Sequence, residues 1–418
     1  MTHSLQVSCT RSTFLSLSFF LILACISVLG LSAAAAGSSE KILHSFMDRP
    51  AQNPRGGLIA DTAGNFYGTA VGSSDGFGVV YELKKSGNSW IYRVLYDFHN
   101  ADDGAEPFGN LILDAAGNLY GVTRLGGTNA CDGGCGTVFE LSPNSNGTWA
   151  ESVLYRFQGG SDGANPIGGL VADTQGAFYG TTMSGGGSNN ICGSMGCGTV
   201  FELAPISGGG WQESILLKFD GATDGYQPEG ALIFGGDGSL YGTTLGGGGG
   251  TQGVVFKLSP SSNGSWSHKV LYNFHGGTDG GQPIAKLTLD KSGNLYGTTT
   301  YGGYPCGCGT VFELTPSGEK VLYAFTDGDD GAFPAGSVVF DPKGNLYGTS
   351  YSSPNTAGAL FKLTATRGKW KITLLEVFTG KNGAYPFGDL YIDSAANLYG
   401  TTQQGGQRYF GTVFKFIP

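Results

Sequence analysis

A Tyr-Gly pair recurs seven times along the 418-residue chain, each time within a segment similar to GNLYGT and at intervals of 51 to 62 residues. Self-similarity at a period of this length indicates a repeat architecture, in which one supersecondary unit packs against the next. The unequal intervals place the insertions in loops. The tyrosines of the seven pairs are Tyr67, Tyr120, Tyr179, Tyr241, Tyr296, Tyr347 and Tyr399.

Each unit contains four apolar segments of strand length, separated by clusters of Gly, Asp, Asn, Ser and Pro that are typical of turns. In the second unit these segments are residues 109–114, 118–123, 137–141 and 151–157, which we term strands A, B, C and D. Short turn-forming links join A to B and C to D, so each pair is expected to form an antiparallel hairpin. No amphipathic helical pattern follows the N-terminal segment. We therefore predict an all-β chain.

Seven repeats of four antiparallel strands predict a seven-bladed β-propeller of four-stranded antiparallel blades. Residues 41–46 align with strand D, and residues 411–418 at the end of the chain align with strand C. The N-terminal strand can therefore pair in the last blade, close the ring and cover an exposed strand edge. The predicted organisation is a signal peptide at 1–36 and a single propeller domain at 37–418.

The first 36 residues have the features of a secretory signal. Arg11 precedes the apolar run 14–31, and residues 34–36 provide an A-x-A cleavage pattern. An alternative interpretation treats Cys25 as the acylated cysteine of a lipoprotein. No later segment is apolar for long enough to span a bilayer. We expect a secreted, periplasmic or envelope protein with no membrane span after cleavage.

The combined unit GTVFEL…LY.F…DG..P.G.L..D..GNLYGTT..GG resembles the repeat of the GloVer family, the Gloeobacter/Verrucomicrobia-type tandem repeats of exported bacterial proteins. The resemblance covers residues 41–418. It implies export and a repeat architecture of the propeller kind. That family has no established activity, so the resemblance implies none for this chain.

Composition limits the classes of partner. The chain has 75 glycines, yet its 40% hydrophobic and 12% aromatic content can supply a core, which excludes a disordered or collagen-like chain. The formal net charge is −9, from 23 basic and 32 acidic residues. A surface of that charge does not favour the phosphate backbone, so we expect no nucleic-acid partner. We expect a monomer.

Six cysteines follow the signal segment, in three close pairs that each fall within one B–C loop. In an exported protein such pairs predict local disulfides. A zinc site would need four ligands in one neighbourhood, and no histidine accompanies any pair. We therefore predict no metal and no other cofactor. The expected bridges are Cys131–Cys135, Cys192–Cys197 and Cys306–Cys308.

A second motif, Asp-Gly-x-x-Pro, lies between strands D and A. Its aspartates suit a turn in which the carboxylate accepts a hydrogen bond from its own downstream backbone N–H. The alternative is a ring of Ca²⁺-binding carboxylates, although one acid per loop provides few ligands. The aspartates are Asp103, Asp162, Asp224, Asp279 and Asp330.

Strand alternation places the B–C and D–A loops on one face, and the loops of variable length are B–C loops. Length variation on one face of a uniform ring indicates the binding face. Strand A begins at the mouth of the central channel, and the position three residues after its proline differs between units. We predict Asn110, Lys286 and Asp389 at this position as binding residues, followed by Arg55 and Glu229, each one residue after its proline.

The sequence contains no serine elbow and no metal-ligand spacing, and each histidine after the signal stands alone. We therefore predict no catalytic residue. The expected function is an exported non-catalytic scaffold that binds a glycan or an envelope protein. The alternative is a polysaccharide-degrading enzyme, either a lyase or a glycoside hydrolase, in which Asp389 and Glu229 serve as acid or base. A purely structural envelope protein is a third possibility.

Overall fold

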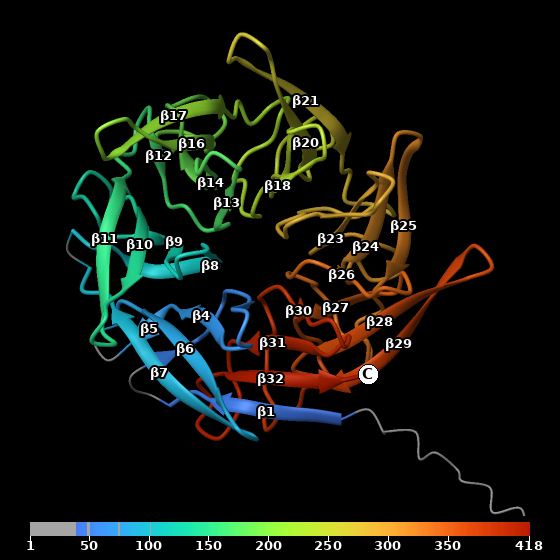
Figure 1. Cartoon of the computed structure of the whole chain (residues 1–418). Coiled ribbons are helices and arrows are strands. Elements are labelled where there is room, and N and C mark those ends of the chain that lie inside the picture. Colours follow the sequence, from blue (N-terminus) through green and yellow to red (C-terminus); the bar gives the residue numbers. More distant parts are fainter. Residues whose placement is uncertain (1–38, 48–50, 74–75, 101) are drawn as a thin grey trace, which may run out of the picture. The chain divides into compact units, whose positions relative to one another are not determined.

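The computed structural model describes residues 39–47, 51–73, 76–100 and 102–418, which form a ring of seven four-stranded antiparallel blades (Figure 1). The predicted all-β, seven-bladed propeller is confirmed. The predicted signal peptide and Cys25 lie outside the described residues. In the described ranges, no helix has the length and apolar character needed to cross a bilayer.

The strands of each blade follow one another outward from the channel. Blade 1 contains β3 (Ile59–Ala60), β4 (Phe66–Ala70), β6 (Val79–Ser86) and β7 (Ser89–Asp97). Blade 2 contains β8 (Ala105–Leu113), β9 (Leu119–Leu125), β10 (Thr137–Pro143) and β11 (Trp149–Arg156). Blade 3 contains β13 (Leu170–Ala172), β14 (Phe178–Thr182), β16 (Thr199–Pro205) and β17 (Trp211–Lys218). Blade 4 contains β18 (Ile233–Phe234), β19 (Leu240–Thr243), β20 (Val254–Pro260) and β21 (Trp266–Asn273).

The remaining blades repeat this order. Blade 5 contains β22 (Thr288–Leu289), β23 (Leu295–Thr299), β24 (Thr310–Thr315) and β25 (Gly318–Ala324). Blade 6 contains β26 (Val339–Phe340), β27 (Leu346–Ser350), β28 (Ala359–Thr366) and β29 (Lys369–Val377). Blade 7 contains β30 (Tyr391–Ile392), β31 (Leu398–Thr402), β32 (Thr412–Ile417) and, from the start of the chain, β1 (Ser39–Ser45).

The two ends of the described chain meet in blade 7. β1 pairs antiparallel with β32, from Ser39 opposite Ile417 to Ser45 opposite Thr412 (Figure 1). The strand therefore covers the outer edge of β32, which would otherwise present unpaired backbone groups. This pairing confirms the predicted closure of the ring.

The innermost strands are shorter than the six residues expected for strand A. In six blades they span only two or three residues, because the segment before them packs against the next blade instead of pairing within its own. A Cβ atom on Gly56 would lie 2.4 Å from the carbonyl oxygen of Gly109, and one on Gly388 would lie 2.6 Å from that of Gly56. Only residues with little or no side chain permit so close a ring around the channel.

The threonine of the YGT motif links neighbouring blades at the same level. Thr243 donates its hydroxyl hydrogen to the carbonyl oxygen of Ala285 over 3.1 Å, and Thr298 does the same to Gly336 over 3.1 Å. Thr401 of the last blade donates to Gly56 of the first over 3.0 Å. The motif thus serves contact between blades as well as strand pairing.

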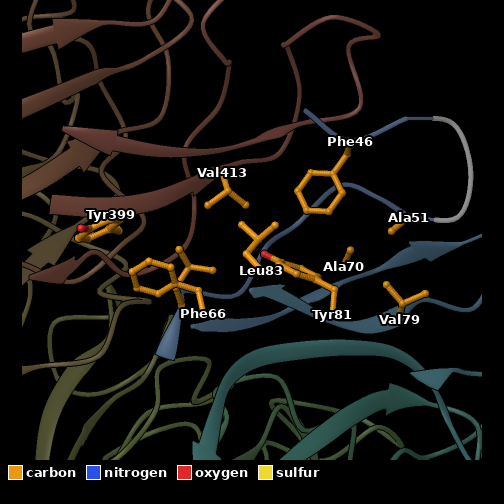
Figure 2. Packing of buried hydrophobic residues seen from close by; sticks show 10 residues of the cluster. Phe46, Ala51, Phe66, Ala70, Val79, Tyr81, Leu83, Tyr399 and Val413 are labelled. Atoms are coloured by element: carbon orange, nitrogen blue, oxygen red, sulfur yellow. The ribbon is translucent and has the colours of Figure 1, made fainter. Parts of the chain in front are cut away.

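The aromatic residues that recur in every unit form the core between blades. Phe98 ends strand D of blade 1 and packs on Phe139 of blade 2, with ring centroids 5.2 Å apart. All seven phenylalanines that end strand D are buried, as are six of the seven motif tyrosines. The tyrosines also hold the A–B turns, since Tyr67 donates its hydroxyl hydrogen to Asp61 over 3.2 Å. One such cluster joins blades 7 and 1 (Figure 2).

Candidate functional site

The B–C and D–A loops share one face of the ring, as expected. β12 (Gly163–Ala164) lies in a D–A connection and pairs with β15 (Ser184–Gly185) in a B–C loop. β2 (Ala51–Gln52) and β5 (Gly72–Ser73) form the same arrangement in blade 1. The two kinds of loop therefore build one surface around the mouth of the channel.

A cavity of about 270 Å³ lies at this mouth, and all seven blades contribute to its wall. The structure brings all five predicted residues together there. The residue after the proline lines the cavity in every blade, because the same position of each repeat converges on the ring axis. The five predicted residues are Arg55, Asn110, Glu229, Lys286 and Asp389.

Three of the five are engaged with one another. Asn110 donates from Nδ2 to Asp389 Oδ2 over 2.7 Å, and Lys286 Nζ lies 3.5 Å from the same oxygen. The backbone N–H of Ser337 donates to Asp389 Oδ1 over 2.9 Å, and that of Gly57 donates to Asn110 Oδ1 over 2.7 Å. These contacts tie five blades together across the axis.

The same contacts set the charge of Asp389. Burial opposes ionisation, but the charge of Lys286 and the hydrogen bonds from Ser337 and Asn110 outweigh it and hold the pKa of Asp389 below its usual value. The carboxylate therefore stays ionised near neutral pH. The contacts of this carboxylate suit a structural role, in which Asp389 holds neighbouring blades together, and do not suit proton transfer.

Glu229 is in the opposite situation. Burial raises the pKa of its carboxyl to about 7, and the nearby charge of Arg124 offsets only part of that rise. Within the described ranges neither carboxyl oxygen has a hydrogen-bond partner. A carboxyl group that is about half ionised near pH 7 and free to meet a ligand can accept or donate a proton.

Two arginines line the same cavity. Arg124 pairs with Glu106, with 2.8 Å between Nη1 and Oε2. The guanidinium of Arg55 lies 5.5 Å from the ring centroid of Phe108 and 6.0 Å from that of Phe387. Its Nε is buried without a hydrogen-bond partner, and no carboxylate of the described chain lies within ion-pair distance of Arg55.

The sequence analysis missed Arg124, Phe108 and Phe387. The two phenylalanines stand directly after Pro107 and Pro386, the position that Arg55 occupies after its own proline. The two phenylalanines would have been found if the residue after the proline had been considered in all seven units, and not only where it is charged. Arg124 opens a B–C loop and has no repeated counterpart that marks it.

The Asp-Gly loops are hydrogen-bonded turns, as predicted, but the backbone donors to Asp103 and Asp279 lie four residues before the aspartate and not downstream of it. Asp103 Oδ2 accepts hydrogen bonds from the backbone N–H of His99 and the hydroxyl of Tyr96, each over 3.0 Å. Asp279 accepts the same two kinds of bond from His275 and Tyr272. Among the described residues, no group of three or more His, Cys, Asp and Glu side chains is placed to hold a metal ion.

The three predicted disulfides are present, and each lies within one B–C loop. The Cα atoms of the paired cysteines are 5.1 to 5.3 Å apart. Such bridges persist in oxidising compartments, so they indicate an extracytoplasmic environment. The bridges are Cys131–Cys135, Cys192–Cys197 and Cys306–Cys308.

Several solved structures are similar to this chain along most of its length. A protein of Lactobacillus plantarum is 16% identical over 88% of this chain and 89% of its own, with a TM-score of 0.52. A gluconolactonase of Xanthomonas campestris is 13% identical over 91% and 89%, with a TM-score of 0.44. A protein of Thermus thermophilus described as an oxidoreductase (glucose dehydrogenase) is 14% identical over 91% and 100%, with a TM-score of 0.42. No curated protein matches the sequence.

The prediction of a non-catalytic scaffold for a glycan or envelope protein, with a polysaccharide-degrading enzyme as its alternative, is wrong. Two of the three neighbours above are described as a gluconolactonase and as an oxidoreductase (glucose dehydrogenase), and these descriptions belong to neither class. The prediction depended on the absence of a catalytic motif, yet a propeller assembles its site from separate repeats, where no local motif is needed. Identities of 13 and 14% transfer no activity to this chain.

The family comparison agrees with the repeats described above. The model of the Gloeobacter/Verrucomicrobia repeat matches residues 31–191 and 187–414, which together span most of the chain. The two matched segments together cover the repeats that build the blades. The chain belongs to the Gloeobacter/Verrucomicrobia repeat family.

Proposed function

We propose that the cavity at the channel mouth is the active site of an enzyme that hydrolyses small carboxylic esters, open or cyclic. The observation that carries this proposal is Glu229, whose carboxyl has a pKa of about 7 and no hydrogen-bond partner in the described chain. A general base works best when its pKa lies near the working pH. Two arginines in the same wall can stabilise negative charge that develops on a substrate.

The reaction needs only water as a second reactant. The carboxylate of Glu229 takes a proton from water while the water oxygen bonds to the ester carbonyl carbon, and the carbonyl π electrons move onto the carbonyl oxygen. Arg124, whose charge acts on Glu229, stabilises that oxyanion. When the carbonyl re-forms, the bond to the leaving oxygen breaks and that oxygen takes the proton from Glu229. The products are a carboxylic acid and an alcohol.

The dimensions and the wall of the cavity support a small substrate. A volume of about 270 Å³ is just below the usual range for ligand sites. Ile167 and Ile284 add apolar surface between the charged groups. A site of this kind, with a few polar groups in an apolar wall, suits one small molecule.

The experiment is a hydrolysis assay on the mature protein with a panel of short-chain chromogenic esters and small lactones. Glu229→Gln is expected to lower kcat/KM by about 100-fold or more. Glu151→Gln is the matched control, since the pKa of Glu151 is also raised to about 7 but the residue lies on β11, outside the cavity. An inactive wild type, or equal activity in Glu229→Gln, would contradict the proposal.

We also infer that residues 1–36 direct export and that cleavage leaves Gly37 as the first residue. The three disulfides support an oxidising destination. N-terminal sequencing of the protein recovered from the envelope and the medium of the producing cells tests this. A mature chain that begins at a lipidated Cys25 would replace the secretory signal with a lipoprotein anchor.

A further inference from the structure

We propose that Arg55 is a carboxylate receptor, so that the ligand of the channel cavity is a small monocarboxylate. The guanidinium lies over the rings of Phe108 and Phe387, at 5.5 and 6.0 Å from their centroids, and the two rings pack edge-on against each other. Its Nε is buried without a hydrogen-bond partner. This inference rests on the proposed function only in that a monocarboxylate is the acid product of the proposed hydrolysis, and binding itself requires no turnover.

The charges around the cavity leave Arg55 as the cation without a partner. Lys286 lies 3.5 Å from Asp389, and Arg124 lies 2.8 Å from Glu106. Tyr351 is close enough for the charge of Arg55 to act on it, but burial raises the pKa of that phenol, so the ring is neutral near pH 7. Within the described part of the chain the guanidinium therefore lacks a counter-ion.

An unpaired cation that is partly removed from water is costly, and an anion that reaches it recovers that cost. The protein as a whole has a net charge of −9, so an unpaired cation at the channel mouth runs against its overall charge. The overall charge of the protein therefore does not explain this cation. A local role in ligand recognition explains it.

The kind of anion follows from the number of cations. A guanidinium offers parallel N–H donors that match the two oxygens of a carboxylate. A phosphate dianion would require more than one free cation, and here Lys286 and Arg124 already face carboxylates. The two aromatic rings hold the guanidinium in place, which reduces the side-chain entropy lost on binding.

Calorimetric titration of the mature wild type with butanoate, butanamide and inorganic phosphate tests the proposal without any variant. Butanamide matches butanoate in size and lacks its charge. We expect butanoate to bind at least 10-fold more tightly than either of the others. Equal affinity for butanamide would overturn anion recognition, and tighter binding of phosphate would overturn the carboxylate assignment.

Two variants then separate binding from turnover. Arg55→Gln is expected to lose the preference for butanoate over butanamide, and unchanged preference would overturn the role of Arg55. Glu229→Gln is expected to keep the preference even though hydrolysis fails. Wild-type affinity for butanoate should fall between pH 6 and 8, because Glu229 becomes anionic in that interval, and should stay level in Glu229→Gln. If the protein binds carboxylate but does not hydrolyse esters, the role of Arg55 as a carboxylate receptor is supported and only the proposed function is contradicted.

Discussion

The ring of Phe46 lies edge-on to that of Tyr81, with centroids 5.2 Å apart and planes at 70° (Figure 2). Phe46 follows β1 and belongs to the last blade, whereas Tyr81 lies on β6 of the first. Six Phe–Phe pairs between the other neighbouring blades have centroid distances of 5.1 to 5.3 Å. The contact between the first and last blades is therefore built like the other six, from a strand that is distant in sequence.

Deleting residues 39–46 should destabilise the protein more than Phe46→Ala does. The single substitution creates a cavity and is expected to cost about 3–5 kcal/mol. The deletion removes the same phenylalanine side chain and also exposes the outer edge of β32 over its whole length. Thermal melting and light scattering measure the two effects. A truncated protein that melts with the full chain and stays monomeric would show that β1 does not hold the ring closed.

The sequence predicted the ring because each repeat carries its strand pattern, its turn residues and its core aromatics. It also predicted which residues meet at the channel, since equivalent positions of a ring converge on its axis. It could not predict that Asn110 bonds to Asp389, because those residues are 279 positions apart and meet only when the ring closes. Nor could it predict the raised pKa of Glu229, which depends on burial by neighbouring blades.

Stability should fall as the pH rises from 5 to 7. Glu151, Glu213 and Glu319 occupy one position of strand D in three blades, and burial followed by a nearby aspartate raises the pKa of each to about 7. Each has one buried carboxyl oxygen without a hydrogen-bond partner. In the unfolded chain these groups ionise near 4.5, so the folded state binds more protons between pH 4.5 and 7 and loses stability across that interval.

Buried histidines have the opposite effect on the pH dependence of stability, but they are fewer than the buried carboxyl groups. Burial lowers the pKa of His44 from 6.5 to about 4, which makes the folded state more stable as the pH rises through that interval. Melting temperatures at pH 5, 6 and 7 should fall in the wild type. They should fall less in the triple variant Glu151→Gln, Glu213→Gln, Glu319→Gln. An identical slope in both proteins would show that these carboxyls do not titrate as described.

Asp389→Asn should destabilise the ring by about 1–3 kcal/mol, because Lys286 loses its counter-ion and Asn110 its charged acceptor. Urea unfolding at pH 7 measures the loss. Asp237→Asn is the control, since Asp237 pairs with Lys257 over 2.9 Å but its side chain is 55% exposed. Such exposed pairs contribute at most about 1 kcal/mol. Equal losses in the two variants would contradict the fastening role of Asp389.

The pH dependence of hydrolysis should report Glu229. As its pKa is raised to about 7, kcat/KM should rise through pH 7 and level off above it. Arg124 lowers that pKa, so Arg124→Gln should move the rising limb to higher pH. Stopped-flow or plate-reader assays from pH 5 to 9 follow the limb. If the rising limb of kcat/KM moved to lower pH in Arg124→Gln, the assignment of Glu229 as the base would be contradicted.

Reduction of the three disulfides should loosen the B–C loops and leave the ring folded. The bridges join residues only four, five and two positions apart, and loops this short give the least stabilisation, about 2 kcal/mol each in the chain-entropy model. The interfaces between blades depend instead on aromatic packing. With a thiol reductant, the circular-dichroism melt should shift by a few degrees while limited proteolysis cuts faster within loops 124–136 and 183–198. Loss of the cooperative melt on reduction, or a bridge between two blades in non-reducing peptide maps, would show that the cysteines hold the ring itself.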